Sequence, residues 1–267
     1  MLTYPDIDPI AFHIGPLAVR WYGLSYLAGI LIAWALMRWR ARRPGSPWSA
    51  DDVGDLLFYL ALGGIIGGRL GYVLFYNLPA YLESPLSLLK VWEGGMSFHG
   101  GLIGLVIAAA WWGRRNGRRF LEVADFAAPA GVPSLFFGRI ANFINGELWG
   151  APTTLPWGMV FPHVDALPRH PSQLYEAVLE GLLLFIVVWL YSRGPRPAGA
   201  VFGLAILGYG LIRVLIELVR EPDGHLGYLA GSWLTMGQAL SAPMILIGLA
   251  LMVLAYRRAA PALRAAR

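Results

Sequence analysis

Three arginines stand inside apolar stretches of this sequence: Arg69, Arg139 and Arg213. A charge at the centre of a membrane-spanning helix costs about 2.5–3.5 kcal/mol, so such residues usually face a protein interior or a water-filled cavity. A guanidinium group binds phosphate through two parallel hydrogen bonds and keeps its charge away from water. We therefore expect the three arginines to share a site for an anionic group, with a phospholipid headgroup as the candidate ligand. The alternative for each is that its long side chain only reaches the headgroup region.

Polar neighbours accompany two of these arginines at helical spacing. Tyr209, Arg213 and Glu217 follow one another every fourth residue, which places them on one face of a helix. Arg139 and Asn142 also share a face. Glu217 is either part of the site or only the ion-pair partner of Arg213, and Asn142 either binds a ligand or holds the turn after it.

Arg69 has a different neighbourhood, because it follows the glycine-rich run GGIIGG. Gly63, Gly67 and Gly71 recur every fourth residue, a pattern that lets a neighbouring helix approach closely. We interpret these glycines as packing residues. Arg69 is then either a substrate-binding residue or one member of an interior ion pair.

The elements that must position these residues are membrane helices. The chain of 267 residues is 57% hydrophobic and 14% charged, whereas soluble domains carry about 25% charged residues. Its apolar runs are about 20 residues long, the length of a helix that crosses a bilayer. We predict an all-α, polytopic membrane helix bundle, with residues 1–267 as one integral membrane domain and residues 145–170 as a short outer cap. The seven predicted transmembrane helices are residues 19–37, 54–76, 96–112, 123–144, 171–192, 198–218 and 235–256.

The loop arginines set the orientation of this bundle. They concentrate at residues 38–43, 114–119, 193–196 and 257–267, which all fall on one side. The opposite side has only Arg20, Lys90, Arg169 and Arg220. Because cytoplasmic loops carry the excess of lysine and arginine, the N-terminus is predicted outside and the C-terminus in the cytoplasm.

This orientation brings polar groups to one depth. The arginines of the second, fourth and sixth predicted helices fall in the outer part of their spans. The third helix starts at that level with Ser97 and His99, and the first with Trp21 and Tyr22. We therefore predict one site just below the outer surface of the membrane.

Several other kinds of site are excluded by composition. The chain has no cysteine, so it has no thiolate metal site, and a thiol in its reaction must belong to the substrate. No GxxxxGK[ST] motif is present, which argues against a nucleotide cofactor. The net charge of +5 comes from loop arginines, so topology explains it without nucleic acid. No metal site is expected, because these histidines form no pair at helical ligand spacing: His13, His163, His170 and His225.

A resemblance to a known family rests on the segment GRIANFINGELWG at residues 138–150. It resembles the signature of the bacterial prolipoprotein diacylglyceryl transferases. Further similar blocks follow in order along the chain: WYGLSYLAG, GGRLGYVLFYN, VWEGGMSFHGGLIG, LPRHPSQLYE, GYGLIRVLIELVREPD and MGQALSAPM. The resemblance implies a seven-span enzyme of the bacterial cytoplasmic (inner) membrane. Such enzymes transfer the diacylglyceryl group of phosphatidylglycerol to the lipobox cysteine of a prolipoprotein signal peptide and release glycerol phosphate.

The resemblance also implies roles for particular residues. By motif position, the family's essential arginines correspond to Arg139 and Arg213, and its histidine corresponds to His99. Arg139, Arg213 and His99 are therefore the predicted catalytic residues. The predicted substrate-binding residues, which include Arg69 from the argument above, are Arg139, Asn142, Tyr22, Tyr209, Glu147, Gly150 and Arg69.

The chemistry of this transfer suits these side chains. A thiol reacts as its thiolate, so either a base such as His99 or a positive environment must help to remove its proton. His99 alternatively satisfies only backbone groups at a helix start. The departing phosphate gains negative charge, which Arg139 and Arg213 can stabilise, with Tyr209 and Asn142 as neutral donors.

Two other functions compete with this interpretation. A lipid or anion transporter would explain intramembrane arginines, but transporters hold their substrate near the midplane, and here the polar groups gather at the outer level. An intramembrane hydrolase would need an activated nucleophile. Ser97 and His99 are poorly spaced on a helix for that role, and no GxSxG motif is present.

Overall fold

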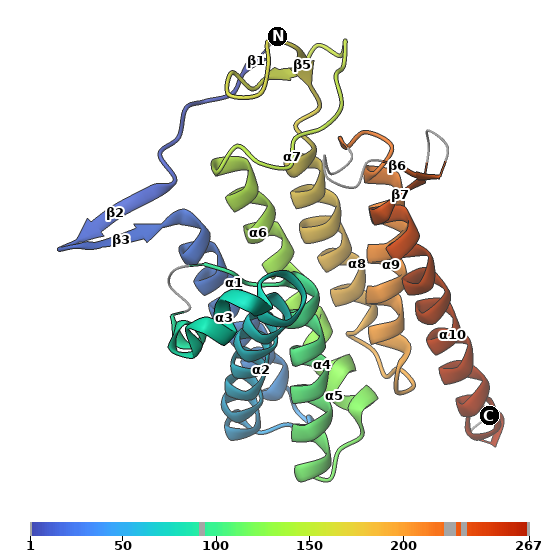
Figure 1. Cartoon of the computed structure of the whole chain (residues 1–267). Coiled ribbons are helices and arrows are strands. Elements are labelled where there is room, and N and C mark those ends of the chain that lie inside the picture. Colours follow the sequence, from blue (N-terminus) through green and yellow to red (C-terminus); the bar gives the residue numbers. More distant parts are fainter. Residues whose placement is uncertain (1, 91–93, 222–227, 231–233, 266–267) are drawn as a thin grey trace. The chain divides into compact units, whose positions relative to one another are not determined.

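The computed structural model describes residues 2–90, 94–221, 228–230 and 234–265, and it is mostly helical (Figure 1). Residues 91–93, in the VWEGGMSFHGGLIG block, and His225 lie outside the described residues. The chain divides into two compact units, which are described separately. Unit 1 comprises Met1–Ala33 and Asp125–Arg267, and unit 2 comprises Trp34–Ala124. That the whole chain forms one membrane domain stays a prediction.

A helical segment is present in each of the seven predicted ranges. Those helices are α1 (Trp21–Ala41), α2 (Ala50–Tyr76), α4 (Phe98–Arg115), the pair α5 (Phe120–Gly131) and α6 (Pro133–Ile144), the series α7 (Ser172–Glu176), η3 (Ala177–Leu183) and α8 (Leu184–Tyr191), then α9 (Ala200–Ile216) and α10 (Met236–Ala265). The short helices α3 (Leu78–Glu83) and η1 (Pro85–Leu89) lie between α2 and α4.

Not all of these helices are long and apolar enough to cross a membrane. Among the described residues, three helical stretches are long and apolar enough: Ala50–Phe75, Ser172–Tyr191 and Met236–Ala260. The bent pair α5 and α6 makes a fourth if it is one span. A membrane protein is therefore supported by length and composition, whereas seven crossings and their orientation stay predictions.

The helix predicted at residues 123–144 is broken in the structure. α5 and α6 meet at a bend of 44° between Gly131 and Pro133. Proline has no N–H for the helical ladder, and its ring clashes with the carbonyl four residues earlier. Pro133 therefore ends the straight helix, and α6 carries Arg139 in a new direction.

The helix predicted at residues 171–192 is continuous but not uniformly α-helical. Its middle part, η3, is a π-helix. Single π-helical turns inside α-helices are rare and frequently occur at functional sites. Glu176 ends α7 and Glu180 lies within η3.

Short strands modify the all-α prediction near the N-terminus and in the 145–170 segment. β1 (Leu2–Thr3) pairs with β4 (Met159–Val160), which pairs with β5 (Pro168–Arg169). Tyr4 packs on this segment, and its hydroxyl donates to the carbonyl of Ile144 over 2.7 Å. The N-terminal strand is thus tied to the end of α6.

Two further strand pairs are local. β2 (Ile10–Ile14) and β3 (Leu17–Arg20) form a hairpin, so α1 begins at Trp21 and not at residue 19. β6 (Tyr228–Ala230) pairs with β7 (Leu234–Thr235) immediately before α10.

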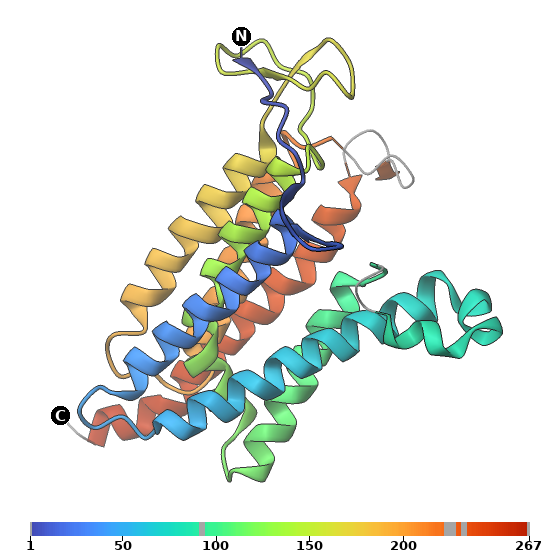
Figure 2. The same cartoon turned by 90° about the vertical axis from the view of Figure 1, so that its left-hand side faces the viewer.

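In unit 1, α6, η3 and α8, α9 and α10 run side by side, as both views show (Figures 1 and 2). A core cluster of Val132, Leu184, Val188, Val201 and Ala205 holds the bend and two of these helices together. Helix α10 packs on α9 at glycines on both partners. This bundle positions the candidate site.

In unit 2, α2 and α4 pack closely through glycines, which confirms their predicted role. A Cβ at Gly63 would lie 2.6 Å from the Cβ of Ala108, and one at Gly71 would lie 2.7 Å from the Cα of Gly100. The backbones are therefore too close for larger residues. Trp112 of α4 is fully buried, and its Nε1 donates to Asp55 of α2 over 2.7 Å.

Candidate active site

Arg139 of α6 and Arg213 of α9 meet in unit 1. Their side chains are 15% and 12% exposed, and between them lie the side chains of Glu176 and Glu180, which are 0% exposed. Burying one charge without a partner costs several kcal/mol, so a buried cluster of this kind requires close pairing. The structure therefore brings together the two arginines that the sequence singled out as catalytic, around two carboxylates.

Glu176 is shared by both arginines. Its Oε2 lies 3.1 Å from Nη1 of Arg139, and its Oε1 lies 2.6 Å from Nη1 of Arg213. Glu180 holds Arg139 at two points, because its Oε2 is 3.1 Å from Nε and 3.0 Å from Nη2. The contact of Glu180 with Arg213 is longer, at 3.8 Å.

Two more charged residues extend the cluster. Glu217 lies 2.5 Å from Nη2 of Arg213, which confirms that it is an ion-pair partner of that arginine. The hydroxyl of Thr235 donates to the other oxygen of Glu217. Nη1 of Arg220 lies 3.6 Å from Glu176. With three arginines and three glutamates, the cluster has a formal charge of zero, which differs from the positively charged site that the arginines alone suggested.

A close backbone approach sets the position of the two central carboxylates. Gly181 follows Glu180, and a Cβ there would lie 2.5 Å from the backbone of Phe136 on α6. Phe136 is three residues before Arg139, so the contact is one helical turn from the guanidinium. Only glycine permits this approach, which places η3 directly beside the arginine of α6.

Two tyrosines predicted to bind substrate also belong to unit 1. Tyr209, one turn before Arg213, is within electrostatic range of Arg139, Arg213 and Glu180. The ring of Tyr22 on α1 lies 5.2 Å from that of Tyr26, a residue that interacts electrostatically with Arg139. Tyr209 thus belongs to the surroundings of the cluster, whereas Tyr22 lies next to a residue that does, and the substrate-binding roles of both stay predictions.

Asn142 and Glu147 close the turn that follows α6. The Asn142 side chain donates to Oε1 of Glu147 over 2.8 Å, and the Asn142 carbonyl accepts from the N–H of Glu147 over 3.0 Å. Gly146, with φ of +65°, makes the turn between them. Asn142 therefore holds the turn, and its role and that of Glu147 in binding the substrate stay predictions.

Gly150 lies where three segments cross. Its N–H donates to the carbonyl of His170 over 2.9 Å, and its own carbonyl accepts from Arg169 over 3.1 Å. A Cβ at this position would lie 2.6 Å from the carbonyl oxygens of both His170 and Val219. Gly150 therefore contributes through close packing of backbones.

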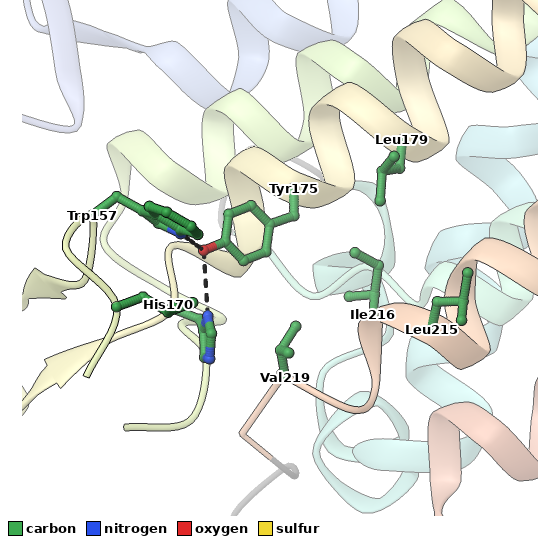
Figure 3. A pocket seen from close by; sticks show the side chains of 8 residues that line it. Trp157, His170, Tyr175, Leu179, Leu215, Ile216 and Val219 are labelled. Carbon is green, nitrogen blue, oxygen red and sulfur yellow. Dashed lines mark hydrogen bonds between the residues drawn. The ribbon is translucent and has the colours of Figure 1, made fainter. Parts of the chain in front are cut away.

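An apolar groove of about 400 Å³ lies beside the start of α7 (Figure 3). Tyr175 stands at its polar end, where its hydroxyl accepts from Nε1 of Trp157 over 2.8 Å and lies 3.3 Å from Nδ1 of His170. Burial lowers the pKa of His170, so its imidazole is held in the neutral form. The remaining lining residues are Leu155, Leu179, Leu215, Ile216 and Val219.

The 145–170 segment has its own ion pairs. Nη2 of Arg169 lies 2.6 Å from Asp165, and Nη1 lies 3.0 Å from Glu221. The hydrogen bond from Arg169 lowers the pKa of Asp165, so the carboxylate stays charged in mildly acidic solution. These contacts fix β5 next to the end of α9.

Arg69 belongs to unit 2. Among the described residues, its hydrogen-bond acceptors are backbone carbonyls and not carboxylates. The side chain is 4% exposed, and its guanidinium lies 5.2 Å from the ring of Tyr81. It donates to five backbone carbonyls, those of Ser87, Leu88, Lys90, Gly94 and Gly95. Because guanidinium has five N–H groups, all its donors are used in these hydrogen bonds, and a role of Arg69 in substrate binding stays a prediction.

His99 lies in the first turn of α4, also in unit 2. The helix is capped by Ser97, whose Oγ accepts from the N–H of Gly100 over 3.2 Å. Capping of that N–H therefore does not require His99, although His99 has interactions of its own. Its role as a base stays a prediction. Among the described residues, no group of three metal-binding side chains could hold a metal ion.

Sequence reasoning missed the two glutamates at the centre of the cluster. Glu176 and Glu180 stand four residues apart inside a predicted span, which is the same signal that drew attention to the arginines. Applied to acids, that rule would have found them. Arg220 was counted as an outer loop cation, although the structure places it against Glu176.

Comparison with known proteins adds an independent finding. Residues 9–254 match the family model described as prolipoprotein diacylglyceryl transferase. A phosphatidylglycerol–prolipoprotein diacylglyceryl transferase of Nitratidesulfovibrio vulgaris (strain DP4) is 58% identical over 249 residues, which cover 93% of this chain and 95% of the relative. The proteins of the same name from Pseudomonas paraeruginosa and Pseudomonas fluorescens are 55% and 56% identical, with both chains covered in full.

Proposed function

Because this chain belongs to the prolipoprotein diacylglyceryl transferase family, we propose that the arginine and glutamate cluster of unit 1 is its active site. The enzyme is a transferase of lipoprotein maturation. It moves the diacylglyceryl group of phosphatidylglycerol to a prolipoprotein, the first step of that process. The acceptor atom in our proposal is the sulfur of the lipobox cysteine in the signal peptide.

The observation that carries this proposal is the meeting of Arg139 and Arg213 around Glu176. Guanidinium groups from two helices are held within reach of one point, inside the segment that the family model covers. Among the described residues, the carboxylates take up only part of the N–H groups of each guanidinium. The remaining N–H groups are donors for a phosphate, in the bidentate geometry that arginine favours.

The reaction makes one bond and breaks one. The cysteine sulfur attacks the glycerol carbon that carries the phosphate ester, so a C–S bond forms as the C–O bond breaks. The electron pair of that bond leaves with glycerol phosphate, and the thiol proton goes to a base. Arg139 and Arg213 stabilise the charge that develops on the leaving phosphate, with the hydroxyls of Tyr22 and Tyr209 as neutral donors.

We assign the proton to His99. The alternative was that a positively charged site alone makes the thiol more acidic. The cluster around Arg139 is neutral overall, so it supplies less positive potential than bare arginines would. An imidazole titrates near neutral pH and is the better acceptor.

We also propose the full predicted topology. Seven spans place the N-terminus outside and the C-terminus in the cytoplasm of a bacterium, across its inner membrane. Three helical stretches, and a fourth if the bent pair is one span, support membrane insertion, and the loop arginines support the orientation. The site then opens toward the outer face, where phosphatidylglycerol and other membrane lipids surround it.

The test supplies phosphatidylglycerol and a lipobox peptide to the purified protein and detects the diacylglyceryl adduct by mass spectrometry. We expect Arg139→Ala to lower the transfer rate by roughly 100- to 1,000-fold while the protein stays inserted and folded. Retained transfer in this variant would refute the assignment of the site. Loss of folding with normal specific activity in the remaining folded fraction would make Arg139 structural.

A further inference from the structure

The carboxylates of the cluster have different partners. Glu176 contacts both Arg139 and Arg213, whereas Glu180 makes its short contacts with Arg139 and Glu217 makes its short contact with Arg213. Glu180 has no other recorded ion-pair partner than these two arginines among the described residues. Its function therefore concerns the arginines themselves.

Geometry gives Glu180 a positioning role. It binds Nε and Nη2 of Arg139 with one oxygen, while Glu176 binds Nη1, so the guanidinium plane is fixed along two of its edges. A guanidinium held in this way cannot rotate about its last bonds. Its remaining N–H groups then keep one direction, which is the condition for donors that stabilise a transition state.

The position of Glu180 is itself set by backbone contact. Gly181 brings η3 against Phe136 of α6, so the backbone that carries Glu180 cannot move away from α6 without separating two helices. The distance between η3 and α6 is therefore fixed, because closely packed backbones leave little free volume.

Charge gives the same carboxylates a second effect. Two unpaired guanidinium groups in a site shielded from water would bind a phosphate dianion very tightly, since Coulomb attraction grows as the dielectric constant falls. Tight binding of both substrate and product does not accelerate a reaction, and it slows the release of the product. Two carboxylates reduce the attraction to a level that permits release.

We propose that Glu176 and Glu180 are positioning residues that orient Arg139 and Arg213 for the phosphate and weaken their hold on the glycerol phosphate product. This inference rests on the proposed phosphate-binding role of the two arginines. It assigns to the acids both an orientation of donors and a control of product release.

The test variant is Glu180→Gln, which keeps the size of the side chain and removes its charge. We expect kcat to fall by roughly tenfold or more, because the guanidinium is less well held. We expect KM for phosphatidylglycerol not to rise, and inhibition by added glycerol phosphate to strengthen by roughly fivefold to tenfold. The matched control is Glu83→Gln, the same change at an exposed position of α3, for which neither constant should change.

A second variant separates orientation from charge and does not depend on the folding of the first. Gly181→Ala keeps both carboxylates and pushes η3 away from Phe136. We expect a lower kcat with unchanged inhibition by glycerol phosphate. Its control is Gly54→Ala, in the first turns of α2, where a Cβ would meet no atom within 4 Å.

The outcomes distinguish this inference from the proposed function. If Glu180→Gln and Gly181→Ala lower only the melting temperature and leave kcat and product inhibition unchanged, the acids are structural and the inference is overturned. If Arg139→Ala leaves the inhibition by glycerol phosphate unchanged, Arg139 does not bind the phosphate, and the proposed assignment of the active site fails first. Sensitivity to Arg139→Ala together with both expected changes supports the inference.

Discussion

Two buried arginines of this chain have opposite surroundings. Arg69 donates to five backbone carbonyls of a nearby segment, and these neutral groups take all its N–H groups. Arg139 pairs with two carboxylates of another helix, which among the described residues take only part of its N–H groups. Both arginines gave the same signal in the sequence, a charge within an apolar run. The two arginines therefore differ in their partners and not in their burial, and we propose that this difference separates an arginine that braces the fold from one that binds the substrate.

The difference follows from the distance along the chain between each arginine and its partners. Most carbonyls around Arg69 lie about 20 residues away in a short turn, so one local segment folds around its side chain. Glu176 and Glu180 reach Arg139 only because a bent helix and a separate span pack together. A local brace stabilises a fold, whereas a contact between helices can assemble a site.

Among the substitutions that test this contrast, lysine at the paired arginines has the largest expected effect. Arg139→Lys keeps the charge, but an ammonium group cannot contact Glu176 and Glu180 along two edges as a guanidinium does. We expect the rate of diacylglyceryl transfer to fall roughly 100-fold, and the same for Arg213→Lys. Single-turnover measurements with phosphatidylglycerol and a lipobox peptide check this. Near-normal rates would mean that charge alone matters there, and the contrast with Arg69 would disappear.

A smaller effect, of a different kind, is expected at Arg69. Arg69→Lys has at most three donors for five carbonyls, so some buried carbonyls lose their partners. We expect a loss of about 2 kcal/mol in the free energy of unfolding, with normal transfer per folded molecule. Thermal unfolding in detergent, together with the activity assay, measures both quantities. A normal melting temperature combined with a slow reaction would show that Arg69 acts on the substrate after all.

The smallest effect concerns pH and His170, which lies at the groove outside the charged cluster. Burial lowers the pKa of His170 below its ordinary value of 6.5, so the unfolded chain binds this proton more readily than the folded one. The stability from the neutral ring is complete above pH 6.5 and is lost as the pH falls through the interval down to the folded pKa. We expect His170→Gln to reduce the drop in melting temperature between about pH 7.5 and pH 5.5. An equal drop in both proteins would contradict this.

Part of this fold and site was predictable from the sequence. Apolar runs located the helical segments, and the spacing of Gly63, Gly67 and Gly71 predicted the close pairing of α2 with another helix. Intramembrane charge predicted a site shared by Arg69, Arg139 and Arg213, and the structure brings two of them, Arg139 and Arg213, to one carboxylate. These features depend on composition and periodicity, which a sequence shows directly.

The remainder depends on contacts that periodicity does not contain. The π-helical turn at Ala177–Leu183 has the same composition as an α-helix, so nothing in the sequence marks it. β1 forms because residues 159–160 lie beside it, about 160 positions along the chain. Pro133 was visible as a helix breaker, but its effect on the direction of Arg139 required the structure.

The contact between Gly181 and Phe136 has a consequence for the site when the thickness of the bilayer changes. A membrane helix whose apolar stretch is longer than the bilayer is thick adapts by tilting. Two helices that touch backbone to backbone tilt as a pair, so the height of Glu180 relative to Arg139 is preserved. We therefore expect the catalytic geometry to remain constant across bilayers of different thickness, even where the helices around it adjust.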